Sequence, residues 1–134
     1  MFKIAVFASL LLLQFSCGKT ASFPPIGKVT KIEVRSNMDA PLKKITDKDR
    51  IAKISAFVDS NATGWGGTND WAGVPVPKIV VNFYDGEKFK GHFGVGANFF
   101  ETQRSGDFMS KNASKVQREE FLALVGIDKS FAEN

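Results

Sequence analysis

The feature that most constrains the fold is a regular alternation of apolar and polar residues on both sides of an Asp-Gly turn. The apolar residues of the alternation are Ile79, Val81 and Phe83 before the turn, and Phe89, Phe93 and Val95 after it. A period of two residues is typical of half-buried strands. Residues 78–96 are therefore predicted to form an antiparallel hairpin.

The register of this hairpin depends on the length of its turn. A two-residue Asp85-Gly86 loop would place Phe83 opposite a lysine, whereas a three-residue loop 84–86 places Val81 opposite Phe89. Because the second register brings apolar residues together, the sequence favours the three-residue loop, with Gly86 in the left-handed conformation.

Other segments predict further strands and two helices. Strands are expected over residues 29–36, 42–45, 98–103 and 108–111. The first helix is expected after Thr46 as N-cap, with a buried face made of Ile51, Ile54, Phe57 and Val58. Together these segments predict an α+β fold: an antiparallel sheet of four to six strands with two helices, in a single small domain over residues 28–134.

The second helix carries the clearest end signals. Ser114 and Gln117 match a capping box, and Gly126 is placed to end the helix in a left-handed cap. Its apolar positions are Val116, Phe121, Leu122, Leu124 and Val125. We expect Leu122 and Val125 in the core and Arg118 outside it.

The N-terminus resembles an export signal. Lys3 is followed by ten residues that are apolar except for one serine, 4–13, a run that matches a secretory signal and is too short to span a membrane. The chain's single cysteine, Cys17, closes this segment behind Ser16, and this arrangement resembles the lipobox of bacterial lipoproteins. Gln14 and Phe15 depart from the usual pattern, in which a leucine stands three positions before the cysteine.

The resemblance implies a signal peptide over residues 1–16 and an acylated Cys17 at the start of a tether, residues 17–27. It also implies a membrane anchor in the bacterial cell envelope, with Gly18 after the cysteine favouring the outer membrane, facing the periplasm. The alternative is ordinary cleavage after Ala21 or Ser22, which would release a soluble secreted form. Multiple acyl chains would give stable attachment, whereas one chain binds only marginally.

Composition excludes several kinds of site. One cysteine and one histidine in 134 residues are too few for a zinc site built from cysteine and histidine ligands, and no metal or cofactor is predicted. The net charge of +4 comes from scattered basic residues, and no cluster predicts a nucleic-acid surface. Gly94 and Gly96 resemble the start of a dinucleotide fingerprint, but Phe99 stands where its third glycine belongs.

The candidate binding site is a glycine-rich segment that holds both tryptophans of the chain. Trp65, Asn69, Asp70 and Trp71 are the candidate partner-binding residues. Long loops often carry function, and tryptophan is enriched at binding hot spots. The alternative is that both indoles fold inward and close the end of the core.

Two functions remain open. The first is a non-enzymatic binding domain on the envelope, such as an inhibitor of, or accessory to, a secreted or periplasmic protein. The alternative is a small envelope hydrolase using His92, the only histidine. Strand parity places His92 opposite the Phe93 face, and we expect it there as a solvent-side residue among lysines.

Overall fold

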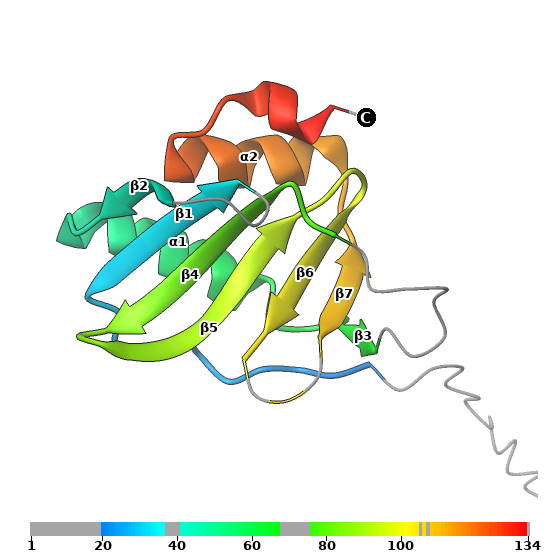
Figure 1. The fold of residues 1–134 in the computed structure, drawn as a ribbon. Helices are drawn as coiled ribbons and strands as arrows, with labels where there is room; N and C mark the ends of the chain where they lie inside the picture. Colours follow the sequence, from blue (N-terminus) through cyan, green and yellow to red (C-terminus); the bar gives the residue numbers. More distant parts are fainter. Residues whose placement is uncertain (1–19, 37–40, 68–75, 105, 107, 134) are drawn as a thin grey trace, which may run out of the picture.

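The fold is one antiparallel sheet with two helices, and it confirms the predicted α+β class (Figure 1). The computed structural model describes residues 20–36, 41–67, 76–104, 106 and 108–133. The sheet has seven strands in the order β2-β1-β4-β5-β6-β7-β3, one more than the upper end of the predicted four to six. The strands are β1 (Lys31–Ser36), β2 (Pro41–Ile45), β3 (Gly66–Gly67), β4 (Ile79–Asp85), β5 (Lys88–Val95), β6 (Phe99–Gln103) and β7 (Met109–Asn112).

Both helices pack on the same face of the sheet. They are α1 (Lys48–Ser60) and α2 (Lys115–Val125), and a short 3₁₀ helix, η1 (Lys129–Ala132), follows α2 (Figure 1). The N-cap of α1 is Asp47, one residue later than predicted, because its carboxylate accepts a hydrogen bond from the backbone N–H of Arg50 at 2.8 Å. The predicted buried face of α1 is confirmed.

The ends of α2 also match the sequence. Ser114 and Gln117 form both hydrogen bonds of the capping box. Gly126 is left-handed, with φ of 72°, and the N–H of Ile127 donates to the carbonyl of Leu122 at 2.9 Å. These contacts fix where the helix begins and ends.

The buried stripe of α2 differs from the prediction at two positions. Leu122 and Val125 are buried as expected, but Arg118 is also buried and Val116 is 73% exposed. Residue 118 lies one helical turn before Leu122, on the same face, whereas residue 116 is turned away from it. The Arg118 guanidinium donates to the carbonyls of Ala113 and Ala132, so this buried cation holds η1 against the helix.

The β4–β5 hairpin has a different register from the predicted one. Asp85 pairs with Lys88, and a bulge shifts the pairing so that Tyr84 lies opposite Phe89 and Phe83 opposite Gly91. The bulge turns Phe89 away from the core, where it is 49% exposed. Gly91 has φ of 128°, and a Cβ added to it would lie 2.8 Å from the carbonyl oxygen of Gln103, so only glycine fits here.

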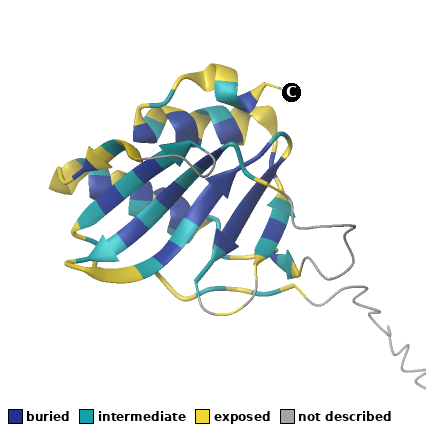
Figure 2. Ribbon diagram, viewed as in Figure 1, coloured by how far each residue is buried: buried dark blue, intermediate teal, exposed yellow. Residues whose placement is uncertain are grey.

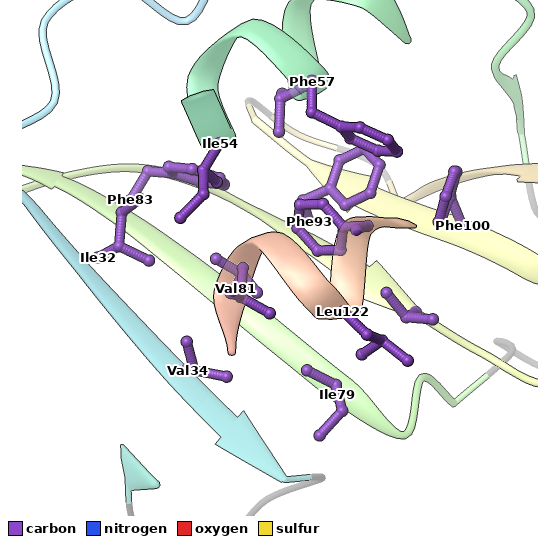
Figure 3. Packing of buried hydrophobic residues seen from close by; sticks show 14 of the residues in the cluster. Ile32, Val34, Ile54, Phe57, Ile79, Val81, Phe83, Phe93, Phe100 and Leu122 are labelled. Carbon is purple, nitrogen blue, oxygen red and sulfur yellow. The ribbon is translucent and has the colours of Figure 1, made fainter. Parts of the chain in front are cut away.

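The core lies between the sheet and the helices (Figures 2 and 3). Its centre is a group of rings from four elements, with centroids 4.7–6.3 Å apart: Phe57 of α1, Phe93 of β5, Phe100 of β6 and Phe121 of α2. Offset and edge-to-face rings stabilise a core beyond the area they bury. The aliphatic residues Ile32, Val34, Ile54, Ile79, Val81 and Leu122 extend this core toward β1 (Figure 3).

The predicted tether, residues 17–27, is in part a segment of the fold. Residues 21–26, here called the strap, run along the lower end of the sheet toward β1 (Figure 1). Ala21 pairs with Trp65, Phe23 packs against the core, and Ile26 is buried. The predicted domain boundary at residue 28 is therefore too late, because apolar residues of the strap cover part of the core. Residues 1–19, with Cys17, lie outside the described part of the chain.

Candidate functional site

Trp65, the first of the predicted binding residues, lies in the core. Its side chain is 2% exposed, and its ring Nε1–H donates to the carbonyl of Asn61 at 2.7 Å. The indole makes edge contacts with Phe23 and Phe93, at centroid distances of 6.1 and 5.8 Å. For Trp65 the prediction of a surface contact is therefore wrong, and the alternative of a core residue holds. Asn69, Asp70 and Trp71 fall outside the described residues.

His92 lies on the side of the sheet opposite the helices, as parity predicts. Its Nε2 lies 2.6 and 2.8 Å from the two carboxylate oxygens of Glu101. Only 12% of the His92 side chain and 2% of the Glu101 side chain are exposed. The expectation of a solvent-side histidine among lysines is therefore wrong, because a strand neighbour supplies a buried carboxylate.

The lack of a side chain at Gly94 makes room for this pair. Gly94 is opposite Glu101 in the register of β5 and β6. A Cβ added to Gly94 would lie 2.9 Å from Oε2 of Glu101 and 2.8 Å from Cβ of Pro77. Glycine at this position thus lets the carboxylate and Pro77 both approach β5, and the carboxylate is shielded from water as a result.

The protonation pattern of the pair leaves one ring nitrogen available. An ionised carboxylate only accepts hydrogen bonds, so Nε2 of His92 carries the proton when Glu101 is charged. The other nitrogen, Nδ1, forms no hydrogen bond with any residue that the structure describes. In the neutral ring Nδ1 is an acceptor, and in the protonated ring it is a second donor.

His92 belongs to a polar row that crosses four neighbouring strands. Glu33 lies opposite Asn82, Asn82 opposite His92, and His92 opposite Gln103. Every member of the row is partly buried (Figure 2). We call the side of the sheet that carries this row the helix-free face, because within the described ranges both helices lie on its other side (Figure 1).

Aromatic residues flank the polar row on this face. Phe89 is 49% exposed and stacks edge-on with Tyr84 at 5.6 Å. Phe108 is 37% exposed, and its ring centroid lies 5.9 Å from that of His92. Exposed aromatic rings around partly desolvated polar groups are typical of protein-binding surfaces.

The cations on this face are mostly engaged with neighbouring groups. Glu33 forms ion pairs with Lys31 at 3.9 Å and with Arg35 at 3.4 Å. Lys31 also lies over the Tyr84 ring, 4.5 Å from its centroid. The helix-free face therefore combines aromatic rings with paired charges, and it does not present a surface charge of a single sign.

Two other cations hold the strap and the adjoining end of α1. Burial lowers the pKa of Arg104, while the charge of Asp59 acts in the opposite direction. Arg104 donates to the carbonyl of Pro24 at 2.6 Å. Burial also lowers the pKa of Lys111, whose Nζ donates to the carbonyls of Asn61 and Thr63. These contacts give both cations structural roles.

The chemistry available at the His92–Glu101 pair is limited. A carboxylate that orients a histidine is the arrangement of a general base, which also needs a nucleophile at the other ring nitrogen. No hydroxyl in the described segments contacts the His92 ring. No group of three or more potential metal ligands occurs among the residues that could be searched.

Glu101 and the exposed phenylalanines are not among the site residues predicted from the sequence. Glu101 is the one charged residue of β6, and a lone charge in an otherwise uncharged strand was a usable signal. Its partner depended on the β5–β6 register. Phe89 was assigned to the core because the sequence gives no sign of the bulge beside it.

Comparison of the chain with protein-family models, with curated proteins and with solved structures finds no match. Within the described residues, no helix has the length and apolar character needed to cross a membrane.

Proposed function

We propose that this chain is a bacterial envelope lipoprotein whose small domain binds a protein partner without catalysing a reaction. Residues 1–16 act as the signal peptide, and Cys17 carries the acyl chains that hold the protein on the membrane. The partner is a secreted or periplasmic protein that the domain inhibits or assists. The position of the single cysteine directly behind the apolar run supports the anchor.

The observation that carries the binding proposal is two exposed phenylalanines on the helix-free face, Phe108 beside His92 and Phe89 beside Tyr84. Phe89 and Phe108 are 49% and 37% exposed on the helix-free face, where neither contributes to the core cluster. The His92–Glu101 hydrogen bond fixes the imidazole beside the Phe108 ring, which supports a role for this face in recognition. Asn69, Asp70 and Trp71, which lie outside the described residues, remain predicted partner contacts.

The alternative, a hydrolase using His92, is favoured by the 2.6 Å contact with Glu101. A fluorophosphonate probe, which reacts with activated serines, distinguishes the two functions. The binding proposal expects no labelling of the folded protein. Labelling that disappears in both His92→Ala and Glu101→Gln would instead establish the hydrolase.

The anchor is tested by the intact mass of protein extracted from membranes. We expect the loss of residues 1–16 and added acyl mass at Cys17, with Cys17→Ser as the control that stays unprocessed. A water-soluble protein that begins after residue 21 or 22 would contradict the anchor and support the alternative cleavage.

The binding face is tested by capture of the partner with matched alanine variants. Phe89→Ala and Phe108→Ala should each weaken binding by more than about 1 kcal/mol, while Val116→Ala, an equally apolar exposed site on α2, should not. Equal binding by all three variants would contradict the assignment of this face.

A further inference from the structure

The chain enters the fold at the outermost strand of the sheet. The N–H of Ala21 donates to the carbonyl of Trp65 at 2.6 Å, and the N–H of Trp65 donates back to Ala21 at 3.2 Å. Trp65 directly precedes β3, which is the last strand in the sheet order. The first paired residue of the chain thus lies beyond one edge of the sheet.

The strap that follows is held along its length. The N–H of Phe23 donates to the carbonyl of Ala62 at 2.8 Å, and the N–H of Ile26 donates to the carboxylate of Asp59 at 2.9 Å. Arg104 binds the carbonyl of Pro24, and its guanidinium lies 5.1 Å from the centre of the Phe23 ring. Residues 21–26 are therefore part of the fold and do not lengthen the segment between the domain and Cys17.

The sequence between Cys17 and Ala21 is short. Four residue steps separate Cys17 from Ala21, which span at most about 14 Å. Six strand spacings separate β3 from β2 at the opposite edge, a width of about 29 Å. At full extension, the segment from Cys17 to Ala21 is thus about half as long as the sheet is wide.

We propose that the domain stands on the phospholipid surface by its β3 edge, with the β2 edge pointing away from the bilayer. This inference rests on the proposed acylation of Cys17. The contact surface is formed by exposed residues around the entry of the strap, among them Ser22, Thr63 and Gly67. In this orientation the bilayer meets an edge of the sheet, so the helix-free face with Phe89 and Phe108 is left open to a partner.

The helix-free face offers little reason for the domain to lie flat. Two of its cations, Lys31 and Arg35, already pair with Glu33, which reduces the positive charge that could attract an anionic membrane. Placing the polar row against lipid would also remove water from His92 and Asn82, at a cost in free energy. The place where the short segment from Cys17 joins the fold, at Ala21, therefore determines the orientation of the domain on the membrane.

Single added cysteines measure this orientation directly. Acylation of Cys17, the only native cysteine, consumes its thiol, so one new thiol can be labelled alone. Full-length Ser22→Cys, Thr63→Cys and Leu42→Cys proteins are purified from membranes, labelled with one fluorophore and placed in phosphatidylethanolamine–phosphatidylglycerol vesicles. Leu42 is the matched control, because it is 53% exposed on β2 at the far edge.

We expect lipids with headgroup nitroxides to quench the labels at residues 22 and 63 several-fold more strongly than the label at residue 42. Equal quenching at all three positions would mean that the domain lies flat, and strong quenching at residue 42 alone would mean that it is inverted. Either result overturns the orientation while leaving the anchor intact. The mass of each sample is measured first, since protein without acyl chains would refute the anchor itself.

Discussion

Removing the Trp65 side chain should destabilise the domain strongly, because this indole joins the strap to the core. The side chain is 2% exposed, contacts Phe23 and Phe93 edge-on, and donates to the carbonyl of Asn61. Replacing a buried tryptophan by alanine costs about 3–5 kcal/mol through lost transfer energy and the cavity that remains. Trp65→Ala should therefore lose much of the stability that a domain of this size has.

A phenylalanine at the same position separates the ring from its hydrogen bond. Trp65→Phe keeps part of the ring packing and removes the Nε1–H donor. The carbonyl of Asn61 retains a second donor, the Lys111 ammonium at 3.4 Å, so it is not left unpaired. We expect the free energy of unfolding to fall by about 1–2 kcal/mol, so that the stability of this variant lies between those of the parent and the alanine variant.

The assay is urea unfolding followed by far-UV circular dichroism, with all variants in a chain of residues 17–134 that carries Cys17→Ser. Val116→Ala is the control, and as an exposed substitution it should change the free energy of unfolding by no more than about 0.5 kcal/mol. If Trp65→Ala unfolds at the same urea concentration as the parent, Trp65 does not close the core. That result would support the prediction from the sequence that Trp65 binds a partner.

Three further changes test other parts of the structure, each by the same unfolding assay. Arg118→Ala should lower the free energy of unfolding by about 2–4 kcal/mol, since it removes charged hydrogen bonds to two buried carbonyls. Lys115→Ala, on the exposed side of α2, should lower it little, and equal effects of the two changes would contradict the buried position of Arg118. Gly94→Ala should destabilise the domain by about 1–3 kcal/mol, because the new methyl group meets Pro77 and the Glu101 carboxylate, and a neutral result would show that β5 is more open than described. A chain that begins at Ile26 should be about 3 kcal/mol less stable than one that begins at residue 20, because it loses four strap hydrogen bonds and the packing of Phe23. Equal stability of the two chains would support the predicted domain boundary at residue 28.

Much of the fold could be predicted because local signals determine it. The capping box at Ser114 and the left-handed Gly126 bound α2 through contacts within a few residues. The buried face of α1 follows from its helical spacing, and the strand pairs follow from alternation. Such features depend on neighbours in the sequence, so a single chain suffices to infer them.

The errors arise where distant residues or a single bulge decide the outcome. The shift beside Gly91 reverses the side on which Phe89 points, and one extra residue in a strand leaves no trace in the alternation. Arg118 is buried because the carbonyl of Ala132, fourteen residues away, accepts from its guanidinium.

The candidate site depended on the same kind of long-range contact. His92 could be placed on the correct side of the sheet by parity alone. Its partnership with Glu101 required the β5–β6 register, and the role of Trp65 required the position of the strap. Periodicity gives the side on which a residue points, but cross-strand contacts determine what it meets.

Site-specific photo-crosslinking in living cells tests the binding face most directly. Benzoylphenylalanine, which extends the phenylalanine ring by a benzoyl group, replaces the exposed Phe89 or Phe108 in the full chain, and it replaces Val116 as the exposed control on α2. After irradiation, we predict that the first two positions trap one and the same envelope protein and that the third traps none. Crosslinks from residue 116 alone, or none from residues 89 and 108 when the protein is folded and anchored, would contradict a partner-binding role for the helix-free face.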